Sequence, residues 1–242
     1  MSRPDLSVVF PVYNEEKNLP VLLDEIRSAL DKHPWSWEVI AVDDGSKDAS
    51  LDVLKQLRRE YPMLRIVKLA RNSGQTAALD AGWAAASGRY VVSLDADLQN
   101  DPADIPSMLR QLERENVDMV IGVRVDRKDS LAKRVQSRIG NSVRDWITGD
   151  RITDTGCSLK LVRADRIGRI RLFNGMHRFL PTLVRMDGGR VIEMPVNHRP
   201  RRYGQSKYGA MNRAVRGLAD CFAVRWMASR KLRYEAEEVS PE

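Results

Sequence analysis

Tyr90-Val-Val-Ser-Leu94-Asp-Ala-Asp97 is an apolar segment that runs directly into two carboxylates. Residues 90–94 have the length and the apolar character of a buried strand, and the aspartates end it. In an open α/β sheet, ligands bind beyond the carboxyl ends of the strands. The segment therefore predicts a strand that delivers Asp95 and Asp97 to a ligand site.

The segments on either side alternate between strand and helix patterns with short connections. Strands are predicted at 6–10, 37–42 and 65–69, and amphipathic helices follow the first two of them. The second half is less regular, with predicted strands at 117–123 and 191–197 and basic amphipathic helices at about 130–147 and 206–230. The pattern predicts an α/β fold with a mostly parallel sheet flanked by helices. We expect one domain over residues 1–230 and a disordered acidic tail over 231–242.

Cysteine usage and hydropathy predict a cytoplasmic protein. Cys157 and Cys221 form no CxxC pair, which excludes a disulfide scaffold or a zinc ribbon and fits a reducing compartment. The longest stretch without a charge, Leu6 to Asn14, has nine residues, whereas a spanning helix needs roughly 20 apolar ones. The first residues also lack the apolar segment of a secretory signal.

Charge divides unevenly along the chain. Residues 1–120 hold 14 basic and 20 acidic residues, and residues 121–242 hold 26 basic and 13 acidic ones. The net charges are −6 and +13, so the second half should face an anion: nucleic acid, acidic lipid headgroups or a phosphorylated substrate. Neither a base-stacking aromatic platform nor a nucleic-acid motif accompanies the basic half, so we expect no nucleic-acid partner.

Asp95 and Asp97 have two interpretations. Both can reach a hard divalent cation, which accepts oxygen ligands and shares its coordination sphere with substrate phosphates. Alternatively they begin a helix, as we expect of Asp101 and Asp104 near Pro102. Like charges beside a buried strand repel each other unless a cation lies between them, which favours the metal.

Two further polar clusters are expected at the same edge of the sheet. Pro11-Val-Tyr-Asn-Glu15 and Asp43-Asp-Gly-Ser46 follow the first two predicted strands. Carboxylates and backbone amides there suit the edge of a base and the hydroxyls of a ribose, although Asp-Gly-Ser is also ordinary turn chemistry. Neither GxxxxGK[ST] nor GxGxxG is present, so the phosphate-loop and dinucleotide fingerprints do not apply.

Five motifs, in this order, resemble the inverting family 2 glycosyltransferases of GT-A fold, and within them the polyprenyl-phosphate branch. They are Pro11–Glu15, Val42–Ser46, Arg71–Gln75, Asp95–Gln99 and Tyr203–Lys207. The last motif, Gly-x-Ser-Lys after the basic loop Arg199-Pro-Arg-Arg202, is the most specific to the lipid-phosphate branch. The resemblance covers Leu6 to Arg230, almost the whole chain.

The resemblance implies transfer of a sugar from a UDP- or GDP-linked donor to a polyprenyl phosphate, with inversion, by a peripheral protein at the cytoplasmic membrane face. It implies a Mg²⁺ or Mn²⁺ ion on the diphosphate, and an active-site arginine at Arg124. Lys133 stands where the branch usually has arginine, so neighbouring Arg134 is an alternative phosphate contact. The implied nucleoside residues are Pro11, Tyr13, Glu15, Asp43 and Asp44; the metal residues are Asp95, Asp97 and Gln99; the acceptor-phosphate residues are Lys133, Ser137, Arg201 and Lys207.

The chemistry of the acceptor separates the competing hypotheses. A phosphate monoester is largely dianionic at pH 7, so it needs cations around it and no general base. A saccharide hydroxyl would need a carboxylate base, for which Asp154 is the candidate, although it also suits a turn. A non-catalytic scaffold of the same fold is disfavoured by the intact aspartate pair.

The apolar faces of the two basic helices leave three possibilities open. They fit docking on an anionic membrane surface, or packing in the core. The helix that ends Phe222-Ala-Val-Arg-Trp-Met227 could alternatively contact a second copy of the chain or a separate membrane protein.

Overall fold

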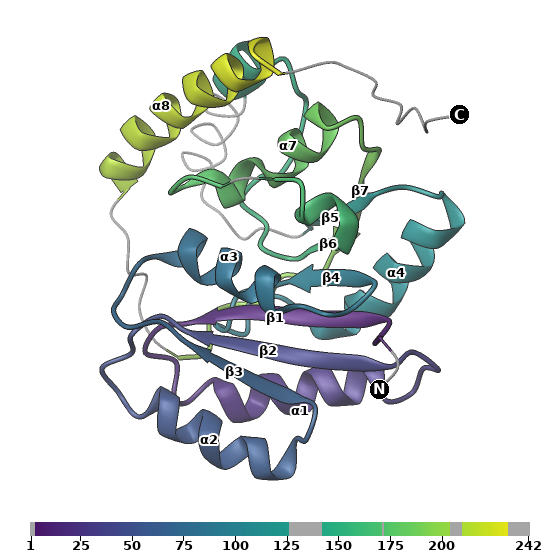
Figure 1. The fold of residues 1–242 in the computed structure, drawn as a ribbon, viewed down its shortest axis with the longest axis vertical. Coiled ribbons are helices and arrows are strands. Elements are labelled where there is room, and N and C mark those ends of the chain that lie inside the picture. Colours follow the sequence, from purple (N-terminus) through teal and green to yellow (C-terminus); the bar gives the residue numbers. More distant parts are fainter. Residues whose placement is uncertain (1–2, 126–141, 171, 204–209, 232–242) are drawn as a thin grey trace, which may run out of the picture.

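The structure, a computed structural model, describes residues 3–125, 142–170, 172–203 and 210–231. Its centre is a seven-stranded sheet of order β3-β2-β1-β4-β6-β5-β7 (Figure 1). The strands are β1 (Leu6–Val12), β2 (Trp37–Asp43), β3 (Leu64–Lys68), β4 (Tyr90–Ser93), β5 (Met119–Arg124), β6 (Lys160–Arg163) and β7 (Val191–Val196). Only β6 runs antiparallel, against both β4 and β5. The predicted mostly parallel α/β sheet is confirmed.

Helices cover both faces of the sheet (Figure 1). They are α1 (Leu19–Leu30), α2 (Ser50–Glu60), α3 (Gln75–Ala85), α4 (Ile105–Arg114), α6 (Ala164–Ile167), α7 (Leu180–Met186) and α8 (Ala210–Ser229), with 3-10 turns η1 (Pro102–Asp104) and η2 (Met176–Phe179). The core over one face contains Leu22 of α1, Leu54 of α2 and Leu109 of α4. The core over the other contains Leu79 of α3 and Val184 of α7.

Helix α3 was not predicted, because its sequence is rich in alanine and lacks a clear polar face. It packs very closely on the sheet at Gly82. A Cβ atom there would lie 2.4 Å from a methyl carbon of Val9 and 2.9 Å from one of Val42. Only glycine fits this contact without displacement of the Val9 and Val42 side chains.

A smaller core lies under α8. Ile147, in a helix over residues 142–148, packs with Cys221 and Val224 of α8 and with Phe179 of η2. The rest of the helix predicted at 130–147, and residues 206–209 of the other predicted helix, lie outside the described residues. Within the described ranges, no helix is long and apolar enough to cross a membrane.

The two predicted caps have different outcomes. Asp101 caps η1, since its carboxylate accepts the backbone N–H of Ala103 at 3.0 Å, as expected. Asp104 stands at the N-cap position of α4, as expected, but its side chain forms no capping hydrogen bond there. Its carboxylate accepts the backbone N–H of Asn197 at 2.8 Å instead, and so ties the end of β7 to η1.

Glu38 of β2 is a buried carboxylate that joins three segments. It accepts hydrogen bonds from Ser7 of β1 at 2.7 Å, from Ser87 after α3 at 2.7 Å and from Arg65 of β3 at 2.6 Å. Burial raises the pKa of Glu38, but the hydrogen bonds from Ser7, Arg65 and Ser87 outweigh it and lower the pKa to about 2.

We expect Glu38→Gln to lower the free energy of unfolding at pH 7 by about 3 kcal/mol. The folded-state pKa lies below the ordinary value, so the stabilisation is complete above about pH 4.5 and is lost as the pH falls toward 2. Urea unfolding of both proteins at pH 7, 4.5 and 3 measures this difference. A gap that stays constant across the series would contradict the account.

Candidate active site

The acidic pair and the basic loop meet beyond the carboxyl end of β4. Asp97, only 7% exposed, forms an ion pair with Arg201 at 2.6 Å between Oδ2 and Nη2. Its other oxygen accepts the backbone N–H of Gln99 at 3.1 Å. Asp95 accepts a hydrogen bond from Gln75 Nε2, at the start of α3, at 2.7 Å. The structure thus brings together residues that lie about a hundred positions apart in the sequence.

Backbone contacts hold the basic loop in this place. The N–H of Arg199 donates to the carbonyl of Gln99 at 2.9 Å, and Asn100 forms an isolated bridge with His198. The guanidinium of Arg199 also donates two hydrogen bonds, of 3.0 and 2.6 Å, to the carboxylate of Glu25 in α1. Arg201 is therefore presented to Asp97 by a loop that is anchored just before it, at His198 and Arg199.

Burial and charge act strongly on Asp95. Burial is the largest cause that raises its pKa, and the charge of Asp97 adds to it. Ser158, Lys160 and Arg201 act in the opposite direction, and the resulting pKa is about 6. Lys160 lies in β6, 5% exposed, and burial lowers its pKa while Cys157 and Asp95 act to raise it. This lysine was not predicted; its signal was a single charge inside the apolar run 157–162.

The donor set fits a hard divalent cation. Two carboxylates and the amide oxygen of Gln99 are oxygen ligands, and Mg²⁺ typically uses one or two carboxylates together with substrate phosphates and water. Among the described residues no group of three or more His, Cys, Asp or Glu could enclose a metal. A cation between Asp95 and Asp97 would remove the repulsion that raises the pKa of Asp95. The residues therefore fit a cation whose coordination sphere is completed by a substrate.

The predicted nucleoside residues lie at the ends of β1 and β2. Pro11 and Tyr13 are partly buried there, and Asp43 is 1% exposed. The carboxylate of Glu15 accepts a hydrogen bond from Asn18 at 2.5 Å. These residues lie at the same sheet edge as the acidic pair, at the ends of β1, which pairs with β4, and of β2, which pairs with β1.

Asp44 has a structural task. Its carboxylate accepts the backbone N–H of Ser73 at 2.6 Å and that of Gly74 at 2.9 Å. It thereby holds the loop that leads into α3. Gly45 permits this approach, because it has a φ of +68° and a Cβ there would lie 2.6 Å from the backbone nitrogen of Asn72.

Arg124, at the end of β5, is locked to Asp154. Two parallel hydrogen bonds join the guanidinium to the carboxylate, at 2.7 and 2.8 Å, and the backbone N–H of Arg124 adds a third at 3.3 Å. Both groups are largely buried, with 19% and 7% of the side chains exposed. Such a bidentate pair fixes the position of the arginine side chain.

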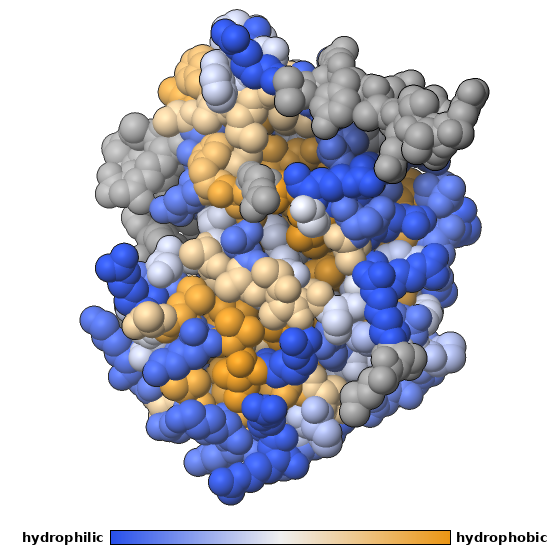
Figure 2. All heavy atoms as spheres, viewed as in Figure 1, coloured by the Kyte–Doolittle hydropathy of each residue, from blue (hydrophilic) through white to orange (hydrophobic). Residues whose placement is uncertain are grey.

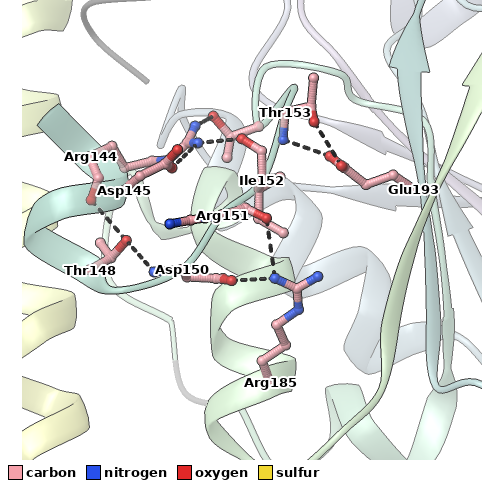
Figure 3. Close-up of polar contacts among 10 residues, drawn as sticks. Arg144, Asp145, Thr148, Asp150, Arg151, Ile152, Thr153, Arg185 and Glu193 are labelled. Carbon is pink, nitrogen blue, oxygen red and sulfur yellow. Dashed lines mark hydrogen bonds and ion pairs between the residues drawn. The ribbon is translucent and has the colours of Figure 1, made fainter. Parts of the chain in front are cut away.

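The loop that leads to Asp154 is itself braced (Figure 3). Arg144 donates to Asp145 at 2.6 Å and to the backbone carbonyl of Ile152. Thr153 donates to Glu193 of β7 through its N–H at 2.6 Å and its hydroxyl at 2.8 Å. The contacts join the helix over 142–148 to β7 and so fix the position of Asp154.

Several residues around Asp95 were not anticipated, and some predicted ones cannot be placed. Ser158, Lys160 and His177 line a cavity with Asp95, although they come from distant segments. Sequence spacing does not reveal such neighbours. The predicted acceptor residues Lys133, Ser137 and Lys207, with the alternative Arg134, lie outside the described residues.

The sheet topology and the acidic site are those of the GT-A glycosyltransferase fold. Glucosyl-3-phosphoglycerate synthase from Mycobacterium tuberculosis, solved with Mn²⁺ and UDP, aligns with a TM-score of 0.68 and 19% identity over 92% of this chain and 80% of that one. A mannosyltransferase from Pyrobaculum calidifontis, solved with GDP-Man and Mn²⁺, aligns with a TM-score of 0.60 and 22% identity over 82% and 57%.

The chain belongs to glycosyl transferase family 2, whose model matches residues 7–174. A dodecaprenyl-phosphate galacturonate synthase from Rhizobium johnstonii is 43% identical over 236 residues, which are 96% of this chain and 68% of the relative. An undecaprenyl-phosphate 4-deoxy-4-formamido-L-arabinose transferase from Salmonella choleraesuis is 37% identical over 207 residues, 85% and 63% of the two chains. The chain thus spans about two thirds of these relatives. The resemblance to the family and its polyprenyl-phosphate branch is confirmed.

We expect Asp95→Asn to stabilise the protein in EDTA at pH 7 by about 3 kcal/mol while it weakens Mn²⁺ binding. The folded-state pKa of about 6 lies above the ordinary 3.8, so the charged carboxylate costs stability above pH 6 and nothing below 3.8. Urea unfolding and Mn²⁺ titration measure the two effects. For the same reason, Mn²⁺ affinity of the unmodified protein should fall as the pH drops below 6.

Asp80→Asn provides the control, because Asp80 is exposed on α3. It should change neither property. An Asp95→Asn variant that is less stable than the unmodified protein in EDTA would show that the carboxylate is not held under repulsion.

Proposed function

We propose that this protein transfers a sugar from a nucleotide sugar to a polyprenyl phosphate, with a divalent cation, at the inner face of the cell membrane. The observation that carries the proposal is the 2.6 Å ion pair between Asp97 and Arg201. Through this pair the guanidinium of Arg201, from the basic half of the chain, lies next to a predicted metal ligand. The two curated relatives act on dodecaprenyl and undecaprenyl phosphates, according to their names, which supports the same acceptor class.

The reaction brings two anions together, and the site has the charges for this. When bound, the divalent cation stabilises the negative charge that develops on the departing diphosphate. Arg201 and Arg124 offer guanidinium groups for the phosphate oxygens of the acceptor, with Lys133, Ser137 and Lys207 expected to add to them. The acceptor phosphate attacks the anomeric carbon directly from the side opposite the diphosphate, so the configuration inverts.

Asp154 disfavours the rival reaction with a saccharide hydroxyl. A general base must be free to accept a proton from the attacking hydroxyl. Both carboxylate oxygens of Asp154 already accept hydrogen bonds from Arg124. In the proposed reaction Asp154 instead positions Arg124, and the dianionic acceptor requires no base.

The proposed reaction is tested with a panel of UDP- and GDP-sugars and undecaprenyl phosphate. We expect a glycolipid of the predicted mass in Mn²⁺ or Mg²⁺ and none with excess chelator. Arg201→Ala should lower kcat/KM for the lipid phosphate by about 10- to 100-fold, the value of a charge-assisted contact, and change nucleotide affinity less than threefold.

Arg58→Ala is the matched control, because Arg58 is exposed on α2. It should leave both constants unchanged. Equal losses of acceptor use and nucleotide affinity in Arg201→Ala would contradict the assigned role. A product formed only on soluble saccharides would overturn the proposed acceptor.

We further propose that α8 docks on the lipid surface. Leu218, Phe222 and Trp226, spaced four apart on α8, have 44%, 55% and 63% of their surface exposed, and Trp146 of the adjoining helix has 78%. Figure 2 shows hydrophobic surface along this edge of the molecule, with hydrophilic residues beside it. Exposed aromatic side chains near basic residues such as Arg230 suit the boundary of an anionic bilayer.

We expect the double substitution Phe222→Ser with Trp226→Ser to reduce sedimentation with anionic phospholipid vesicles at least tenfold, because it removes the largest exposed apolar side chains of α8. Turnover of a short-chain, water-soluble polyprenyl phosphate should persist. Undiminished vesicle binding, or a loss of the soluble activity as well, would contradict a docking role.

A further inference from the structure

A small cavity with both polar and apolar lining residues extends from the metal site into the molecule, under α3. Its volume is about 20 Å³, and its polar lining residues are Gln75, Ser93, Asp95, Ser158, Lys160 and His177. Asp95 and Ser158 also line a second cavity, which contains Asp97, Gln99 and Arg124. The two cavities therefore meet at Asp95. A substituent of a molecule bound at the metal site can therefore reach the first cavity.

Two side chains at this cavity have unused hydrogen-bonding groups. Trp83 is 7% exposed and Ser93 is 3% exposed. The indole N–H of Trp83 and the hydroxyl of Ser93 are buried, and neither has a hydrogen-bond partner among the described residues. A buried polar atom without a partner costs free energy. Two such donors beside one cavity therefore indicate that a ligand group which accepts hydrogen bonds enters it.

His177 lines the same cavity. Its Nδ1 lies 2.7 Å from Oγ1 of Thr76, and that hydroxyl oxygen also accepts the backbone N–H of Gly175 at 2.9 Å. Burial keeps the ring neutral, since it lowers the pKa of His177 to about 3, so His177 adds no charge to the cavity.

Lys160 gives the cavity its charge. Its ammonium group donates to the backbone carbonyl of Cys157 and forms no ion pair with any residue in the described part of the chain. Asp95 is the only carboxylate among the lining residues. Once a divalent cation neutralises Asp95, the cavity holds a net positive charge and several donors.

We propose that this cavity receives a carboxylate substituent of the donor sugar, so that the preferred donors are nucleotide-linked uronic acids. The inference rests on the proposed function and names its substrate class. A space of about 20 Å³ holds about one water molecule, which suits one small polar group at the edge of a sugar and not the ring. Lys160 is then a specificity-determining residue that contacts the substrate.

Matched donors that differ only at one carbon test the proposal: UDP-galacturonate with UDP-galactose, UDP-glucuronate with UDP-glucose, and GDP-mannuronate with GDP-mannose. We expect the best uronate to exceed its neutral partner at least 100-fold in kcat/KM for glycolipid formation. Calorimetric binding of the same pairs, in Mn²⁺ and without lipid, should show the same order.

Three variants connect the preference to the cavity. Lys160→Met should reduce the uronate preference at least tenfold, and Trp83→Phe, which removes only the indole N–H and part of the ring, should reduce it several-fold. Lys55→Met makes the same chemical change as the first variant at an exposed position of α2 and should leave the preference unchanged. If Lys160→Met does not fold, Trp83→Phe decides.

The outcomes separate this inference from the proposed function. Equal or better use and binding of the neutral sugars would overturn the inference and leave the transfer to polyprenyl phosphate standing. Uronate-selective binding without any glycolipid would support the cavity assignment and overturn the acceptor. A preference that survives in both Lys160→Met and Trp83→Phe would also overturn the inference.

Discussion

The chemistry of the candidate active site depends on the repulsion between two carboxylates at the end of β4. Asp95 and Asp97 follow β4, and their proximity, together with burial, raises the pKa of Asp95 to about 6. Arg201 offsets the charge of Asp97 from one side and Lys160 that of Asp95 from another. Such a pair is unfavourable without cations, and this makes it a receptor for a divalent ion and a diphosphate.

The topology explains how one edge of a sheet acquires both signs of charge. β1, β2 and β4 run in parallel and deliver acidic residues from the first half of the chain. β6 enters between β4 and β5 in the opposite direction, which places Ser158 and Lys160 beside Asp95. The loop after β7 then closes over Gln99. The acidic first half and the basic second half of the sequence thus meet at one edge of the sheet in the folded protein.

Much of the fold and the acidic part of the site could be predicted, because these features are local. A buried strand followed by Asp-x-Asp can be recognised within eight residues. Helix α3 could not be predicted, since its packing depends on the contact of Gly82 with β1 and β2. Strand β6 could not be predicted either, because it is only four residues long. Asp44 and Asp104 illustrate a second limit, because their partners, the backbone of residues 73–74 and of Asn197, are fixed only by the tertiary structure.

Anomalous diffraction from crystals grown with Mn²⁺ and a nucleoside diphosphate tests the central claim most directly. The account predicts one strong Mn²⁺ peak bonded to Asp97 with Asp95 beside it and the diphosphate completing the coordination. A Mn²⁺ ion bound elsewhere, with the diphosphate away from both aspartates, would contradict it.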